Sequence, residues 1–223
     1  ENIEANDLSI SVTGQTELIP KEIKIPGDIS SASFLMIAAT IVKDSELKLK
    51  QVGINPTRTG LIEVLESMGA NIEIVNQRQV CGEPVGDIIV KSAKLKGVTI
   101  EGEIIPKLVD EIPIIAVAAA YAEGTTIIKD AKELRYKESD RLKAISMELK
   151  KMGIDIQETH DGLVINGAKK IEGNCQCYSH CDHRIAMAIY IAALAAQNPV
   201  IIEDAGWFKI SFPEFNVVMD KLR

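Results

Sequence analysis

The strongest constraint on the fold is a short phrase that occurs twice in the chain. Residues 68–72 (MGANI) and 152–156 (MGIDI) each place a glycine after an amphipathic helical pattern and before an alternating strand pattern. An aspartate stands before a long apolar stretch upstream of each phrase, at Asp28 and at Asp110, and the spacing to the glycine is nearly the same in both copies. A repeat of this size indicates one supersecondary unit that is used more than once.

A third copy of the pattern begins at Asp182, which also stands before an apolar stretch, residues 185–196. Each copy contains one stretch that is apolar on all sides, typical of a buried helix, and the first two add a striped helix that would cover it. We therefore expect an α/β domain of three βαβαββ-like units, with three sheets around three buried parallel helices. We assign one domain to residues 1–223, with repeats at about 24–80, 100–168 and 176–223.

The three aspartates occupy the same place in each repeat. Asp28, Asp110 and Asp182 all stand directly before a predicted buried helix. An aspartate in this position commonly accepts hydrogen bonds from the first free N–H groups of the helix, and for Asp28 this capping role is the favoured interpretation. We expect each of the three to lie within two residues of a helix start.

The composition is that of an ordinary globular protein, with 46% apolar and 26% charged residues. The formal net charge of −7 argues against nucleic-acid binding, which needs a basic face, but it permits a small anion held by local cations. The apolar runs are too short to span a bilayer and no secretory leader is visible, so we expect no membrane association. Four cysteines without such a leader predict reduced thiols and a cytoplasmic location.

Three of the cysteines cluster in one short segment together with a histidine, as Cys175, Cys177, His180 and Cys181. Zinc sites usually combine two such groups that are well separated in the sequence. We therefore expect free cysteines in a loop and no metal site.

The most polar segment, residues 135–141 (RYKESDR), stands immediately before an apolar stripe with helical spacing. The stripe consists of Leu142, Ile145, Leu149 and Met152. Free N–H groups and the positive end of the helix dipole make such a helix start suitable for anions. Ion pairs within a solvated helix start would give the same pattern, and the segment alone leaves both interpretations open.

Five segments occur in a characteristic order and spacing. They are 27–32 (GDISSA), 55–60 (NPTRTG), 110–113 (DEIP), 137–141 (KESDR) and 182–184 (DHR). Together they resemble the C-terminal half of the 5-enolpyruvylshikimate-3-phosphate (EPSP) synthase family, over nearly the whole chain. The resemblance implies a two-domain clamp with three repeats in each domain and the active site between them. It implies transfer of the enolpyruvyl group of phosphoenolpyruvate to the 5-hydroxyl of shikimate 3-phosphate with release of phosphate, and no metal or cofactor.

The same resemblance implies roles for individual residues. Asp110 resembles the acid/base residue that contacts the 5-hydroxyl of shikimate 3-phosphate, and Glu138 the acid/base residue near the enolpyruvyl methylene. Lys137 resembles a substrate-binding lysine, and Arg141 and Arg184 resemble the arginines that hold phosphoenolpyruvate. Arginine suits a ligand with a carboxylate and a phosphate because its paired N–H donors match both groups.

Further candidates are less clearly placed by the motifs. His183 lies inside the 182–184 motif, and Arg58 either lines the cleft or forms an ion pair at a helix start. The family often has a lysine where this chain has Ile210, and Lys209 stands one place earlier. An asparagine often found before the 137–141 motif is replaced by Glu133.

The N-terminal half of the family pattern is missing, including its shikimate-phosphate site. We therefore expect this chain alone to be inactive, and its natural partner to be that missing half. Lys137, Arg141 and Arg184 are expected to repel one another mildly when no anion is bound. A UDP-N-acetylglucosamine enolpyruvyl transferase-like domain and a folding or binding module without turnover stay open as alternatives.

Overall fold

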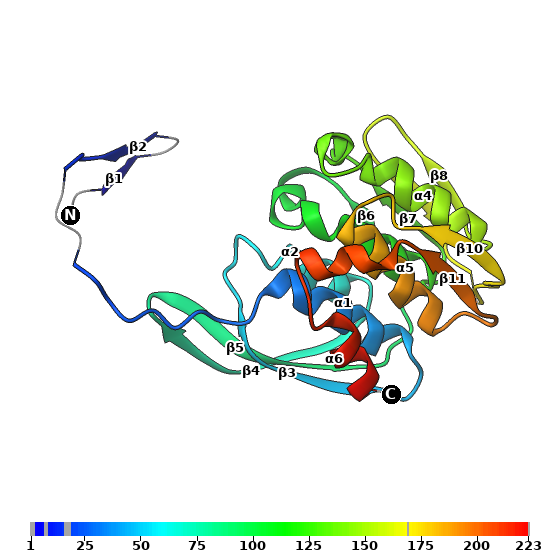
Figure 1. Ribbon diagram of the computed structural model, residues 1–223, viewed down its shortest axis with the longest axis horizontal. Helices are drawn as coiled ribbons and strands as arrows, with labels where there is room; N and C mark the ends of the chain where they lie inside the picture. Colours follow the sequence, from blue (N-terminus) through cyan, green and yellow to red (C-terminus); the bar gives the residue numbers. More distant parts are fainter. Residues whose placement is uncertain (1–2, 7–8, 16–18, 169, 223) are drawn as a thin grey trace.

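Three buried helices form the centre of the molecule. The computed structural model describes residues 3–6, 9–15, 19–168 and 170–222. The helices α1 (Ile29–Ile41), α3 (Ile112–Ala120) and α5 (His183–Leu194) all contact one another, and α1 and α5 are labelled in Figure 1. Every residue of α3 is buried, because that helix has a neighbour on each side. The three predicted buried helices are confirmed.

The second repeat contains the full predicted order of elements. They are β6 (Thr99–Ile100), α3, β7 (Thr125–Ile128), α4 (Arg141–Lys151), β8 (Asp155–Glu158) and β9 (Leu163–Asn166). Their sheet has the order β6-β7-β9-β8, with a parallel β6–β7 pair and antiparallel pairs elsewhere. The predicted βαβαββ unit is therefore present.

The first repeat has the same arrangement with a reduced first strand. An isolated parallel bridge between Gly27 and Val52 stands where β6 pairs with β7. Its remaining elements after α1 are β3 (Glu46–Gly53), α2 (Gly60–Ser67), β4 (Asn71–Val80) and β5 (Glu83–Lys91). The order β3-β5-β4 matches β7-β9-β8 in the second repeat.

The third repeat begins with a strand that the sequence analysis assigned to a loop. Its elements are β10 (Cys175–Tyr178), α5, β11 (Val200–Glu203), η4 (Ala205–Ile210) and α6 (Phe215–Leu222). The expectation of cysteines in a loop is wrong for Cys175 and Cys177, because β10 pairs in parallel with β11 and buries Cys177. Strand formation here depends on pairing and on which side chains face the core, and local composition reports neither.

The phrase that occurs twice in the sequence produces the same helix end twice. Gly69 and Gly153 follow α2 and α4 with φ of 91° and 93°. In each case the glycine N–H and the next N–H bond back to carbonyls of the last turn, at 2.9 and 2.9 Å after α2 and at 3.0 and 3.1 Å after α4. This left-handed termination favours glycine, which has no Cβ to clash.

All three repeat aspartates lie at helix starts. Asp28 and Asp182 directly precede α1 and α5, and Asp110 stands two residues before Ile112, where α3 begins. The prediction for the three positions is confirmed. The stripe of α4 is also buried, from Leu142 to Met152.

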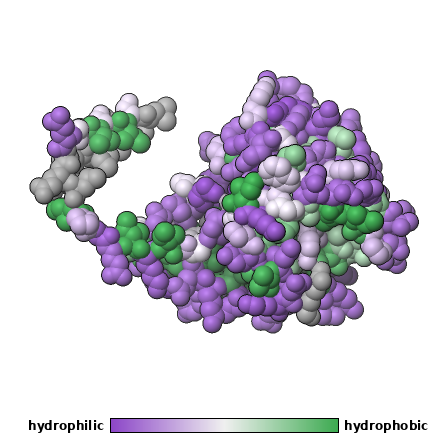
Figure 2. Space-filling model, viewed as in Figure 1, coloured by the Kyte–Doolittle hydropathy of each residue, from purple (hydrophilic) through white to green (hydrophobic). Residues whose placement is uncertain are grey.

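An extended arm precedes the packed body and touches it at Cys81, whose Sγ accepts a hydrogen bond from the backbone N–H of Lys24 at 3.4 Å. The hairpin β1 (Ile3–Asn6) and β2 (Ser9–Val12) precedes an extended segment, residues 19–26, that leads to Gly27, as Figure 1 shows. Ile19, Ile23 and Ile25 on this segment are all strongly exposed, and Figure 2 shows apolar side chains along the arm. Among the described residues, no helix has the length and apolar character needed to cross a membrane.

Candidate active site

The polar segment 137–141 meets the N-terminal ends of the central helices in one cluster of charged side chains. Two short 3₁₀ helices stand directly before these elements. The first, η2 (Val109–Glu111), leads into α3, and the second, η3 (Lys132–Tyr136), leads into the polar segment. Asp140 caps α4 by accepting a hydrogen bond from the backbone N–H of Lys143 at 3.1 Å. The helix α4 packs against α5, and its first residue, Arg141, bonds to Asp110 of η2.

Arg135 fastens this start to the hairpin of the second sheet. Its Nη1 donates to Asp140 at 2.9 Å and to Glu158 at 2.7 Å. Its Nε and Nη2 donate to the backbone carbonyls of His160 and Thr159. A guanidinium with four such bonds holds the loop before α4 in one position.

Arg141 lies at the centre of the cluster. Its side chain is 1% exposed, and its guanidinium contacts a carboxylate from each of three places in the chain. Nε donates to Asp182 at 2.8 Å, Nη1 to Asp110 at 3.0 Å and Nη2 to Glu138 at 2.5 Å. Arg141 therefore joins the second and third repeats, and an anion reaching it would compete with carboxylates already bound.

Asp110 faces three cations. Besides Arg141, it lies 3.7 Å from Lys137 Nζ and 3.8 Å from Arg184 Nη2. Burial acts to raise the pKa of Asp110, but the charges of Arg184, Lys137 and Arg141 together outweigh it and hold the pKa below its ordinary value. Asp110 is thus ionised at neutral pH, which is the state in which a carboxylate accepts a proton.

Lys137 is held by two carboxylates. Its Nζ lies 2.6 Å from Glu133 and 3.7 Å from Asp110. The hydrogen bond with Glu133 is the main cause that raises the pKa of Lys137, so the ammonium stays charged. Glu133, the residue that departs from the family pattern, is therefore a direct partner of the motif lysine.

A second part of the cluster lies between the first and third repeats. Glu111, next to Asp110, accepts a hydrogen bond from Ser30 Oγ at 2.5 Å and lies 3.5 Å from Arg184 Nη1. Ser30 Oγ in turn accepts a hydrogen bond from Arg58 Nη2 at 2.9 Å. The structure thus brings Arg58, which the sequence placed only loosely, to the cluster through a serine hydroxyl.

The expected repulsion between the cations is present, since the charge of Arg141 acts to lower the pKa of Lys137, but neighbouring carboxylates outweigh it. Lys137, Arg141 and Arg184 each form an ion pair with at least one carboxylate. Glu138 and Asp182 belong to the two cationic motifs themselves, but Asp110, Glu111 and Glu133 lie outside them, so counting charges within the motifs misses these three. The cations of the cluster are neutralised before any ligand arrives.

The two carboxylates predicted for acid–base chemistry differ in their surroundings. The Asp110 side chain is 30% exposed and faces three cations, whereas that of Glu138 is 50% exposed and contacts Arg141. Two carboxylates in unlike environments can carry opposite protonation tasks. Their roles in catalysis stay a prediction.

Two further residues that the sequence suggested for the site differ in whether they reach the cluster. His183 is the first residue of α5, and burial and the charge of Arg184 lower its pKa, so its ring is neutral at neutral pH. Lys209 is exposed on η4 and, among the described residues, forms no ion pair or hydrogen bond with the cluster. The structure thus brings His183 to the edge of the site but does not bring Lys209 into it.

Sequence reasoning misses three residues of the cluster. Asp182 is assigned only to a helix start and Ser30 and Glu111 to no role, yet all three hold arginines in place. A signal is present for Glu111, because a second acidic residue directly before an apolar helix is unusual for a core position. The partners of Asp182 could not be found, since Arg141 is distant in sequence.

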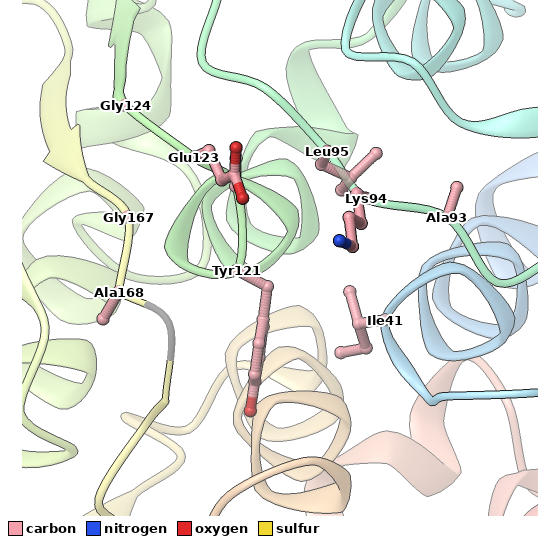
Figure 3. A pocket seen from close by; sticks show the side chains of 10 residues that line it. Ile41, Ala93, Lys94, Leu95, Tyr121, Glu123, Gly124, Gly167 and Ala168 are labelled. Carbon is pink, nitrogen blue, oxygen red and sulfur yellow. The ribbon is translucent and has the colours of Figure 1, made fainter.

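A large cavity lies away from the cluster. It has a volume of about 750 Å³ and is bordered by Ile41 and Tyr121, which follow or end the C-terminal turns of α1 and α3. Figure 3 shows the Lys94 ammonium pointing into it, with Glu123 on the opposite side. The charged cluster is at the other ends of these helices and contributes no residue to this cavity.

Among the described residues, no group of three or more metal-binding side chains is placed to hold an ion.

Fold and cluster together define a class: an α/β domain of three repeated units whose helix starts carry paired carboxylates and guanidinium groups suited to acid–base chemistry on an anion. Comparison with known proteins identifies the family within this class. The family model described as EPSP synthase (3-phosphoshikimate 1-carboxyvinyltransferase) matches residues 2–219. The chain belongs to the EPSP synthase family.

Individual relatives agree. The chain is 55% identical to the 3-phosphoshikimate 1-carboxyvinyltransferase of Petrotoga mobilis over its full length, which is 52% of that protein. It is 54% identical to the enzyme of Desulforudis audaxviator over 96% of the chain and 50% of the relative. The EPSP synthase structure from Acinetobacter baumannii superposes with a TM-score of 0.93 at 40% identity, covering 99% of this chain and 51% of that one. The chain thus spans about half the length of the relatives it matches.

Proposed function

We propose that this chain is the C-terminal domain of an enzyme that transfers the enolpyruvyl group of phosphoenolpyruvate to the 5-hydroxyl of shikimate 3-phosphate and releases phosphate. The observation that carries the proposal is the meeting of Asp110, Lys137 and Glu138 around the buried Arg141, at the N-terminal ends of the central helices. The relatives named for this reaction support the choice of substrates. The UDP-N-acetylglucosamine alternative is not favoured, because these relatives carry the shikimate-enzyme name.

Asp110 and Glu138 divide the proton transfers in this proposal. Asp110, ionised beside three cations, accepts the proton of the attacking 5-hydroxyl. Glu138, half-exposed at the surface of the cluster, takes up a proton from solvent and gives it to the methylene carbon of phosphoenolpyruvate. In the elimination that follows, Glu138 takes a proton from the methyl carbon of the tetrahedral adduct, and Asp110 gives its proton to the departing phosphate. Lys137, Arg141 and Arg184 stabilise the charge on the carboxylate and phosphate of the substrate.

The cluster also supports the view that a second half is needed. Since Lys137, Arg141 and Arg184 are already neutralised by carboxylates, an arriving anion finds little excess positive charge in this chain. Holding two substrates in reacting geometry also requires groups on the other side of the cleft, and this positioning is worth on the order of 7–11 kcal/mol in the best cases. The strongly exposed isoleucines of the arm fit a segment that another part of the protein covers. We therefore expect the chain alone to bind phosphoenolpyruvate weakly and to show no turnover.

The localisation proposed for the enzyme is cytoplasmic. All four cysteines are free, and Cys175 and Cys177 stay unlinked although their sulfur atoms lie 3.8 Å apart. Free thiols are typical of a reducing compartment.

The test is phosphate release from phosphoenolpyruvate plus shikimate 3-phosphate. The chain is assayed alone and after fusion to the N-terminal half of the Petrotoga mobilis relative, which restores the missing side of the cleft. We expect release only from the fusion, and Glu138→Gln to remove most of it, because the amide keeps the shape but cannot carry the proton. Glu103→Gln, at an exposed glutamate of η1 (Gly102–Lys107), is the matched control and should leave the rate unchanged.

Three results would contradict the proposal. Brisk release by the chain alone would remove the need for a second half. A fusion whose rate survives Glu138→Gln would remove the acid–base role of that residue. A folded fusion that releases no phosphate from these substrates would leave the folding or binding module as the better description.

A further inference from the structure

One carboxylate of the cluster has no part in the proton transfers described above. Glu111 follows Asp110 at the start of α3 and is 2% exposed, far less than its neighbour. Burying an ionised carboxylate is unfavourable unless hydrogen bonds and a cation compensate it. The partners of Glu111 are therefore the key to its presence.

These partners come from the other two repeats. Oε1 of Glu111 accepts the hydrogen of the Ser30 hydroxyl at 2.5 Å, from α1. A hydroxyl has a single hydrogen to donate, so Ser30 faces Arg58 as an acceptor, at 2.9 Å. The same Oε1 lies 3.5 Å from Nη1 of Arg184, from α5. One oxygen atom of the second repeat thus connects an arginine of the first repeat with an arginine of the third.

Arg184 is oriented by the same 3₁₀ turn on two sides. Its Nη1 donates to the backbone carbonyl of Asp110 at 3.2 Å and faces Glu111, while its Nη2 lies 3.8 Å from the carboxylate of Asp110. The side chain is only 14% exposed, so few other orientations are open to it. A guanidinium recognises an anion through the direction of its N–H donors, and that direction is fixed here by η2.

We propose that Glu111 is a positioning residue, which holds the guanidinium groups of Arg58 and Arg184 in register for an anionic substrate across all three repeats. This rests on the proposed function, because the substrate of that reaction supplies the anion. Glu111 itself does not touch the reacting atoms. It acts through Arg184 directly and through Ser30 on Arg58.

The negative charge of Glu111 and its positioning of the arginines predict different effects when the residue is replaced. Burial is the main cause that raises the pKa of Glu111, and the Ser30 hydrogen bond and the charges of Arg184 and Arg58 oppose it. Removing a negative charge next to an anion site strengthens the attraction for an anion. Losing the orientation of the arginines instead lowers the rate, because a misplaced substrate reacts slowly even when it is bound. A positioning role therefore separates turnover from affinity.

The experiment compares Glu111→Gln with Glu148→Gln. Glu148 is the matched control, because it is another fully buried glutamate, but its carboxylate is bound by Lys151, His180 and a backbone N–H away from the arginines. Inorganic phosphate binding is measured on the chain by titration calorimetry, and kcat on the fusion with the Petrotoga mobilis half. For Glu111→Gln we expect kcat to fall at least about tenfold while the phosphate Kd changes by less than about threefold. For Glu148→Gln we expect kcat within about twofold once folded protein is counted, and lowered stability.

A measurement that does not depend on turnover distinguishes failure of the positioning role from failure of the proposed function. The side-chain Nε–Hε signal of Arg184 in ¹⁵N-labelled chain, assigned with Arg184→Lys, should shift and broaden in Glu111→Gln and stay in place in Glu148→Gln. Ser30→Ala removes the hydroxyl that joins Glu111 to Arg58 but leaves the contact between Glu111 and Arg184. It should therefore change the Arg58 signal more than the Arg184 signal, which also serves if Glu111→Gln folds poorly. An inactive wild-type fusion would overturn the proposed function. The arginine signals would still show whether Glu111 orients Arg184 and Arg58.

Three results would overturn the positioning role. They are unchanged arginine signals in Glu111→Gln, a kcat within twofold of the wild-type fusion, and a kcat that falls only in proportion to folded protein, as in the Glu148→Gln control. The last of these would leave Glu111 as a stabilising residue at the start of α3.

Discussion

The N-terminal ends of α1 and α3 begin from the same position of the repeat, but they use its aspartate differently. Asp28 accepts hydrogen bonds from the backbone N–H groups of Ser30 and Ser31 at 3.2 and 2.8 Å, and one from the Ser31 hydroxyl at 2.8 Å. Asp110 makes no such bond, because the turn η2 intervenes and no side chain caps α3. Its carboxylate faces Arg141, Lys137 and Arg184 instead.

The difference shows how one repeat position serves structure in one copy and chemistry in another. A carboxylate that caps a helix has its oxygens occupied by backbone N–H groups, so it is a poor proton carrier. Moving the helix start by one residue, from directly after Asp28 to two residues after Asp110, releases the carboxylate from this duty. The third copy is intermediate, since Asp182 caps α5 through the N–H of Arg184 at 2.8 Å and also binds Arg141 Nε at 2.8 Å.

The largest effect on stability is expected at the third copy. Asp182→Ala leaves the buried guanidinium of Arg141 without its most buried partner, and breaking such a pair costs roughly 3–5 kcal/mol. Urea denaturation of the chain measures the free energy of unfolding. A loss of about 1 kcal/mol, no more than a helix cap provides, would make Asp182 a copy of Asp28 and break the distinction.

The amphipathic helices provide a matched pair in which no difference is expected. Leu65 in α2 and Leu149 in α4 are both completely buried and stand four residues before the terminating glycine. Leu65→Ala and Leu149→Ala should each lower the unfolding free energy by roughly 2–4 kcal/mol, as should Leu142→Ala. Values below about half a kcal/mol for either helix would place its stripe in solvent, contrary to the observed packing.

The functional difference is tested at Asp110. Asp110→Asn in the fusion with the Petrotoga mobilis half should lower turnover about a hundredfold, because the amide cannot accept a proton. Unfolding free energy should change by less than about 1 kcal/mol, since this partly exposed carboxylate leaves Arg141 with two other partners. A rate within twofold of wild type would show that Asp110 has no role in proton transfer, although it does not cap its helix.

The converse is expected at Asp28. Asp28→Ala should lower the unfolding free energy by about 1 kcal/mol through the lost helix cap. Turnover of the fusion should be unchanged once folded protein is counted. A large loss of rate without a loss of stability would place Asp28 in the site and make the first copy resemble the second.

The smallest effect is a change in the acid limb of the stability curve. Burial acts to raise the pKa of Asp182, but hydrogen bonding and the charge of Arg141 outweigh it, so the folded pKa is below the ordinary value of 3.8. The unfolded chain therefore binds this proton more readily, and the stabilisation is present above about pH 4 and lost as pH falls through the folded pKa. Urea denaturation between about pH 5 and pH 2 should give a shallower decline for Asp182→Asn than for wild type. Equal slopes would contradict the lowered pKa.

Local patterns were sufficient for much of the fold. The buried helices follow from stretches with no polar face, and α4 follows from the spacing of its stripe from Leu142 to Met152. The two left-handed helix ends follow from Gly69 and Gly153. Strand β10 could not be found this way, because its polar and small residues become a strand only by pairing with β11.

The sequence by itself determined the repeat, the helix starts at the three aspartates, and the motifs that place Lys137, Glu138 and Arg141 together, because these depend on contacts between near neighbours in the chain. Only the tertiary structure decided which carboxylate neutralises which cation. Arg141 bonds to Asp182, and Glu111 reaches Arg184 and Ser30, across long sequence separations. Such pairings depend on how the three central helices pack, and electrostatic partners are set by distance in space rather than along the chain.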